Sequence, residues 1–194
     1  MKTIRLMMLM VGLSIVCVGC HGIIYNRLSR TDREMIPYHI GDTVRFVDER
    51  GERVTVVATE EERSWDITSE EFTELQVERL TVRLKSDTGN HYILVFVAGH
   101  EANDDTRHME VWTNQAGADL RYSSVGELVN HCNSIVYDSV VIGGRVYHNV
   151  AWGNGRSPVG YNEGYYSKTH GLLQMQTDGK TVFTLDTVIF AGAR

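Results

Sequence analysis

Apolar and polar residues alternate along most of this chain, in runs rich in β-branched and aromatic side chains. A period of two is typical of strands that bury one face, because successive side chains point to opposite sides of a sheet. The run Tyr92 to Val97 is instead apolar at consecutive positions, which indicates a strand buried on both faces. We therefore expect strands over the segments 44–46, 54–56, 80–85, 92–97, 109–113, 119–122, 134–142, 145–152, 172–177 and 180–185.

Turn residues separate these runs at short spacings, so neighbouring strands are expected to form hairpins. Gly143-Gly144 and Asp178-Gly179 suit two-residue turns, which require positive φ angles. We also expect a short acidic helix over Thr68 to Glu74 and a single helical turn over Glu127 to His131. The expected turns lie at 48–51, 87–90, 115–117, 143–144 and 178–179.

Strands do not alternate with helices in this pattern, which excludes a doubly wound α/β fold. The expected fold is mainly β, a single antiparallel β-sandwich or curled half-barrel domain with short helical segments.

The first residues of the chain differ from the rest. Lys2 and Arg5 precede an almost unbroken apolar run from Leu6 to Val18. As a helix this run would span roughly 20 Å at about 1.5 Å per residue, too short for a hydrocarbon core of about 30 Å. Residues 1–19 are therefore predicted to be a signal peptide that is removed on export.

The signal peptide ends in Cys17-Val18-Gly19-Cys20, which resembles the lipobox of bacterial lipoproteins. Gly19 and Cys20 match that motif, whereas the position that is usually leucine holds Cys17. The alternative is an ordinary signal peptide cut nearby, but no A-x-A-like site lies close. The resemblance implies lipidation of Cys20 and a place in the cell envelope, anchored to a bacterial membrane, with the outer membrane favoured.

Three further segments resemble a family of uncharacterised lipoproteins from Gram-negative bacteria. They are the first strand at 37–46, the strand-turn-strand segment 137–150, and a tyrosine-rich hairpin made by 165–175 and 178–180. That family has no assigned activity, so the resemblance implies a structural likeness and no site residues.

The domain boundaries follow from the period of the pattern. Residues 20–37 have no clear period and are expected to be a lipid-anchored tether. Residues 38–194 are expected to be the β-rich globular domain, and their length is enough for one substantial core.

Charge and cysteine content narrow the range of partners. The formal net charge of -6 becomes -8 once Lys2 and Arg5 leave with the signal peptide, so bulk electrostatics does not favour nucleic acid. Beyond Cys20, the mature chain has only Cys132. Stability is therefore expected to come from apolar burial, with no disulfide, cofactor or metal.

The strongest candidate for a binding surface is a group of aromatic residues around a glycine-rich segment. Trp152, Tyr161, Tyr165 and Tyr166 flank Gly153 to Gly164, which we expect to be the most mobile loop of the domain. Flat rings on a loop would stack on a glycan or an envelope protein. The alternative is that the rings pack on the sheet beneath, and solvent exposure separates the two.

Two polar groups are weaker candidates. One group is the adjacent pair His131 and Cys132, with Asp138 and His148 nearby in sequence. Enzymes with a cysteine nucleophile use a cysteine with a histidine base. Neighbours in sequence point in different directions, so we favour a buried, structural Cys132. The other group, considered for metal binding, consists of His100, Glu101, Asp104, Asp105 and His108. Its spacing matches no compact metal motif, so a solvated acidic loop is favoured there.

No catalytic constellation is visible, so we expect a non-catalytic interaction or structural module of the cell envelope. The alternative is a carrier of an apolar ligand or lipid, similar to sorting proteins or lipocalins, which requires a hollow sheet. A hydrolase with an unrecognised site is the third hypothesis and requires a convergent polar cluster in a cleft.

Overall fold

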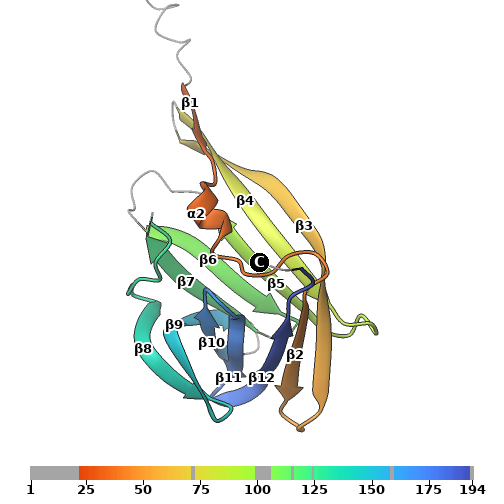
Figure 1. The fold of residues 1–194 in the computed structure, drawn as a ribbon. Helices are drawn as coiled ribbons and strands as arrows, with labels where there is room; N and C mark the ends of the chain where they lie inside the picture. The colour runs from red at the N-terminus through yellow and green to blue at the C-terminus, as the bar shows by residue number, and fades with distance from the viewer. Residues whose placement is uncertain are drawn as a thin grey trace, which may run out of the picture.

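The computed structural model describes residues 22–70, 73–98, 106–114, 116–123, 125–157 and 160–192, and within them twelve strands form one sheet (Figure 1). The predicted signal peptide and Cys20 lie outside the described residues. The mainly β fold with a short helical segment is thereby confirmed. The elements are β1 (Gly22–Asn26), α2 (Arg30–Arg33), β2 (Thr43–Asp48), β3 (Arg53–Glu70), β4 (Thr73–Lys85), β5 (Tyr92–Ala98), β6 (Thr106–Thr113), β7 (Gly117–Ser123), β8 (Ser134–Ile142), β9 (Arg145–Ser157), β10 (Gly160–Ser167), β11 (Gly171–Thr177) and β12 (Lys180–Ile189).

The sheet curls until its two sides meet. Neighbouring strands follow the order β1, β4, β3, β2, β12, β11, β10, β9, β7, β6, β5, and β5 pairs again with β4, which closes a ring. Among the described strands, β1 and β4 pair in parallel and the other neighbours are antiparallel. The β7–β9 junction is narrow, with Asp119 opposite Asn154, and β8 pairs with the rest of that edge of β9.

The predicted hairpins are present. β2–β3, β4–β5, β6–β7, β8–β9 and β11–β12 are antiparallel neighbours at the expected turns. Gly143 and Gly144 have φ angles of 57° and 77°, and Asp178 and Gly179 have 49° and 73°. These are the positive values that such tight turns require.

Neither predicted helix forms. β3 runs on to Glu70 and β4 begins at Thr73, so the helix expected over Thr68 to Glu74 is wrong. Pairing between the two strands satisfies the backbone groups that a short helix would have satisfied internally, and tertiary pairing overrides local propensity. Residues 127–131 are held by isolated bridges to neighbouring strands and form no helical turn.

The protein's own side chains fill the ring. Along β7, Leu120 and Tyr122 are buried while Asp119 and Arg121 stay partly exposed, which is the alternation expected of a sheet with one inward face. The interior is therefore a packed core. Its largest fully buried side chains are Tyr38, Tyr122, Tyr166, Phe46, Met35, Leu84, Met109, Leu120, Leu172, Leu173, Met175 and Val44.

The segment expected to be a tether is part of this fold from Gly22 onward. β1 pairs with β4, and the side chains of Leu28, Met35 and Ile36 are buried in the core cluster. The expected domain start at Tyr38 is therefore too late in the chain. These apolar residues are isolated and irregularly spaced, so no period reveals their burial.

Polar contacts also hold α2 against the ring. Ser29 caps the helix, and its side chain accepts a hydrogen bond from the backbone N–H of Asp32. Asp32 is fully buried and forms an ion pair with Arg107 of β6. The Tyr166 hydroxyl donates to the carbonyl of Met35 at 2.7 Å. In the part of the chain described, no helix has the length and apolar character needed to cross a membrane.

Candidate functional site

The glycine-rich segment from Gly153 to Gly164 is a hairpin, and the expectation of a loop there is wrong. Its described residues belong to β9 and β10, which pair in register, with Tyr165 opposite Trp152. Strand alternation then sends the four predicted rings to different places. Tyr166 is fully buried, Trp152 and Tyr165 are half-buried, and Tyr161 is 43% exposed.

The glycines of this hairpin allow close packing. A Cβ atom at Gly153 would lie 2.1 Å from the carbonyl oxygen of Asp119, and one at Gly155 would lie 2.7 Å from that of Gly117. A Cβ at Gly164 would lie 2.7 Å from the side chain of Ala118. Three glycines therefore let β9 and β10 approach β7 more closely than any other residue would allow.

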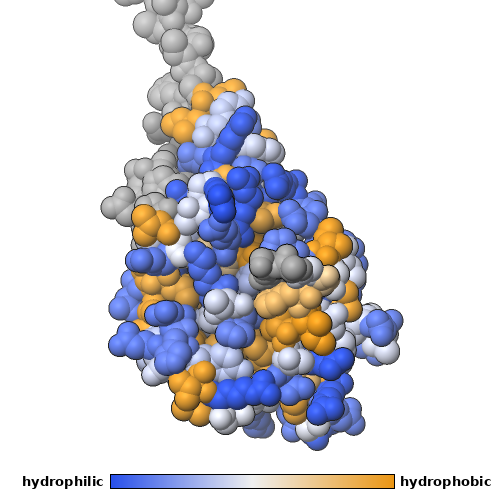
Figure 2. Space-filling view, in the orientation of Figure 1, coloured by the Kyte–Doolittle hydropathy of each residue, from blue (hydrophilic) through white to orange (hydrophobic). Residues whose placement is uncertain are grey.

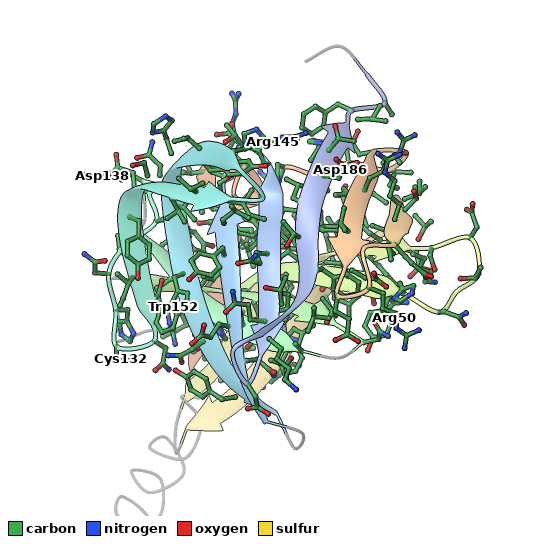
Figure 3. All side chains as sticks on the ribbon, turned by 90° about the horizontal axis from the view of Figure 1, so that it is seen from below. Arg50, Cys132, Asp138, Arg145, Trp152 and Asp186 are labelled. Carbon is green, nitrogen blue, oxygen red and sulfur yellow. The ribbon has the colours of Figure 1, made fainter. Side chains whose placement is uncertain are left out.

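The outer side of β8, β9 and β10 carries an aromatic face, which we define as Ile135, Tyr137, Trp152 and Tyr165. Ile135 pairs with Trp152, and Trp152 pairs with Tyr165, so these side chains form a row across three strands. Gln174 of β11 continues the row beyond Tyr165. Figure 3 shows this side of the sheet, with Trp152 on β9. Of the four predicted rings, Tyr161 is exposed, Trp152 and Tyr165 are half-buried on this outer side, and Tyr166 belongs to the core.

A groove of about 540 Å³ adjoins this face at the β7–β9 junction, and we call it the junction groove. Asn154 and Tyr161 connect the two surfaces, because they follow Trp152 on β9 and precede Tyr165 on β10. Backbone at Gly117 and Gly155 forms part of the groove wall. Its side chains include Glu110, Trp112, Asp119, Asn133, Asn154 and Tyr161.

Trp112 is held in a defined orientation in the junction groove. It pairs with Gly117 across β6 and β7, and a Cβ at Gly117 would lie 2.5 Å from the indole ring. The ring therefore lies against the bare backbone of that glycine. Its Nε1 donates a hydrogen bond to Glu110, and the side chain remains 39% exposed. Sequence reasoning missed Trp112, although an exposed position in an alternating strand next to a glycine was a usable signal.

Tyr161 is positioned from the other side by the β11–β12 turn. The Asp178 carboxylate accepts a hydrogen bond from the backbone N–H of Tyr161 at 2.9 Å, and the Tyr161 carbonyl accepts one from the N–H of Asp178 at 2.8 Å. Asp178 is free to make both contacts because it adopts a positive φ angle at the turn. The predicted turn therefore also fixes the start of β10.

The carboxylates of the groove are balanced by neighbouring cations. His108 Nε2 lies 3.0 Å from Glu110 Oε1 and 2.9 Å from Asp119 Oδ1, and Arg121 Nε lies 3.8 Å from Asp119 Oδ1. Burial alone would lower the pKa of His108, but hydrogen bonds to Asp119 and Glu110 and their negative charges outweigh burial and raise its pKa to about 9. With His108 protonated at neutral pH, the two cations, His108 and Arg121, balance the two carboxylates, Glu110 and Asp119.

The weaker candidates do not assemble into a site in the described residues. Of the acidic group that was considered for metal binding, only His108 lies within them, and no group of three His, Cys, Asp or Glu side chains there is placed to hold a metal ion. Cys132 is exposed, so the expectation of a buried thiol is wrong, and its Sγ lies 3.0 Å from Nδ1 of adjacent His131. Asp138 and Cys132 lie well apart in Figure 3.

A larger groove of about 1100 Å³ lies beside α2, with both charged and apolar walls. Two of its charged groups are already engaged. Arg30 pairs with Glu34 at 2.7 Å, and Lys168 donates to the carbonyl of Gly126 at 3.4 Å. We therefore place the candidate site at the junction groove, where exposed rings and polar side chains converge.

Comparison with protein-family models, with curated proteins and with solved structures finds no match to this chain.

Proposed function

We propose that this protein is a non-catalytic, lipid-anchored module of the cell envelope that binds a neutral glycan in the junction groove. The observation that carries the proposal is the pair of exposed rings, Trp112 and Tyr161, lining one groove with carboxylate and carboxamide side chains. A volume of about 540 Å³ is typical of a site for a small ligand.

The chemistry of the groove matches a sugar. The apolar C–H face of a sugar ring packs flat on an aromatic ring, while its hydroxyls hydrogen-bond to carboxylate and amide oxygens. His108 and Arg121 neutralise Glu110 and Asp119, which favours an uncharged ligand over a cation or an anion. The aromatic face continues from Tyr161 along β9 and β10, so a longer glycan would extend toward it.

The packed interior gives the carrier hypothesis no support, since the side chains of the core cluster occupy the space that an apolar ligand would need. The hydrolase hypothesis needs an acid or base free to exchange a proton with substrate. In the groove, Glu110 and Asp119 are both engaged by His108. A binding role is therefore the better match to this arrangement.

A binding assay on the glycan site tests the proposal. The lipidated protein on vesicles is titrated with a panel of neutral oligosaccharides, and Tyr161→Ala and Trp112→Ala are each expected to weaken binding about tenfold or more, about 1.4 kcal/mol. Tyr92→Ala is the matched control, because Tyr92 is also exposed but lies outside the groove. Full affinity in Tyr161→Ala, or no binding by the wild type, would contradict the proposal.

Gly117→Ala tests whether binding depends on the orientation of the Trp112 ring. The new methyl would displace the Trp112 ring without removing any side chain that lines the groove. We expect a loss of affinity close to that of Trp112→Ala, with an altered tryptophan emission spectrum.

The anchor is tested separately. Metabolic labelling with a fatty acid should mark the wild type and leave Cys20→Ser unlabelled, because Cys20 is the residue that the lipobox-like motif places for acylation. Equal labelling of both proteins would contradict the anchor proposal and would leave the glycan proposal unaffected.

A further inference from the structure

Three strands form an extension that lies outside the closed ring. β4 pairs with β5 only from Arg79 to Lys85, whereas its residues 73–77 pair with β1 on one side and with the end of β3 on the other. In Figure 1 this part of the sheet projects past the rest of the molecule, with β1 at its edge. We define the extension as β1 with residues 65–70 and 73–78.

One face of the extension carries four exposed apolar side chains. Ile23, Tyr25, Trp65 and Ile67 are 50%, 54%, 41% and 61% exposed. Alternation and register put them on one face, and the Tyr25 and Trp65 rings meet edge to face with centroids 6.0 Å apart. Ile24, on the opposite face, is also exposed. Figure 2 shows hydrophobic surface at this end of the molecule.

Cys20 is only two residues before Gly22. An extended chain spans at most about 3.6 Å per residue, so the α-carbon of Cys20 lies within about 7 Å of that of Gly22. A protein held by lipid on Cys20 would therefore keep the extension at the membrane surface, because the folded chain leaves no long tether between them.

We propose that the extension inserts the four exposed apolar side chains of this face into the interfacial region of the bilayer that holds the Cys20 lipid; this rests on the anchor of the proposed function. Tryptophan and tyrosine favour the boundary between headgroups and acyl chains, and isoleucine side chains are buried there. The contact would add apolar burial to the acyl anchor and restrict how the ring is oriented above the membrane.

The same face also carries Glu74, Gln76 and Glu78 of β4, which lie between the apolar residues of β1 and those of β3. Glu74 accepts a hydrogen bond from Gln76 Nε2, and Glu78 accepts one from the backbone N–H of Leu28 at 2.9 Å. Carboxylates on this surface would be repelled by anionic lipid, so attraction to headgroup charge cannot supply the binding energy. We therefore expect the extension to insert into zwitterionic bilayers, and we expect salt to have no effect on the insertion.

Trp65 serves as the probe. Lipidated full-length protein is reconstituted in phosphatidylcholine vesicles with brominated acyl chains, which quench a tryptophan on contact. The chain has three tryptophans, so two variants each keep one. The variant that keeps only Trp65 is expected to lose most of its emission, and the variant that keeps only Trp152 is expected to lose little.

A matched pair of substitutions checks the apolar contact. Ile67→Ser should reduce the quenching of Trp65, whereas Val141→Ser, on similarly exposed Val141 of β8, should leave it unchanged. Equal quenching of Trp65 and Trp152, or an unquenched Trp65 in protein that floats with the vesicles, would overturn the insertion alone. Failure of the wild type to float with the vesicles would overturn both the anchor and the insertion.

Discussion

At the scale of single residues, the tightest constraint joins Gly171 to Tyr38. A Cβ atom at Gly171 would lie 1.9 Å from the Tyr38 hydroxyl oxygen, and Gly171 has a φ angle of +76°. The hydroxyl donates to the His170 carbonyl at 3.1 Å and accepts from the N–H of Leu172 at 2.8 Å. Burial raises the pKa of Tyr38, so the hydroxyl stays protonated and keeps both bonds.

Gly171→Ala should therefore destabilise the protein far more than Gly179→Ala. Both glycines have positive φ angles, but nothing lies within 4 Å of a Cβ at Gly179. We expect a loss of about 1 kcal/mol in the free energy of unfolding for Gly179→Ala and about 3 kcal/mol or more for Gly171→Ala. Urea denaturation measures both, and equal losses would show that the contact with Tyr38 is not limiting.

His108 should make stability depend on pH. Its folded-state pKa of about 9 lies above the unfolded value of 6.5, so its contribution is fully present below about pH 6.5 and is lost as pH rises through 9. The loss is at most about 3 kcal/mol, because solvent screening weakens these partly exposed ion pairs. Unfolding free energies measured from pH 6 to pH 10 should show a smaller fall in His108→Gln than in the wild type. Parallel curves for the two proteins would contradict this assignment.

At the scale of elements, the segment before β2 acts as part of the fold. β1 extends the sheet, α2 ion-pairs with β6 through Asp32 and Arg107, and the following residues cover the core. The Met35 carbonyl accepts the hydrogen bond of Tyr166 in β10. The segment before β2 thus contacts strands from distant parts of the chain.

A chain that begins at Pro37 is expected to lose cooperative folding. It lacks the buried side chains of Leu28, Met35 and Ile36, worth about 1.5–3 kcal/mol each, against a typical total stability of about 5–15 kcal/mol. It also leaves Arg107 without Asp32. Thermal unfolding followed by circular dichroism compares it with a chain that begins at Gly22. A shared melting temperature would show that the segment is dispensable.

At the scale of the whole molecule, the closed ring has a packed interior, so we expect binding to take place on its outer surfaces. The junction groove and the extension are formed by different strands, which allows the proposed glycan contact and membrane contact to operate together. Cys132 is a free, exposed thiol, so it takes no part in holding the ring together. Stability rests on apolar burial across the sheet.

The melting temperature of the folded domain should therefore be the same with and without chelator or reductant. Binding of a metal or formation of a disulfide in the native state would link either reagent to folding. Differential scanning calorimetry with a chelator, with a thiol reductant and with neither provides the measurement. A clear fall in melting temperature with the chelator would indicate a bound metal, and a fall with the reductant would indicate a disulfide.

Strand alternation and turn residues are local signals, and they predicted the hairpins at Gly143-Gly144 and Asp178-Gly179 as well as the mainly β fold. Closure of the ring depends on pairings between distant strands, which no short window of sequence contains. The groove arises at one such pairing, Asp119 with Asn154, and so Trp112 and Tyr161 line one groove only in the folded chain. Glycine residues occur both in flexible loops and where two backbones pack closely, and the sequence does not distinguish the two cases. Only the folded structure, in which β7 packs against Gly153, shows that this glycine allows close packing.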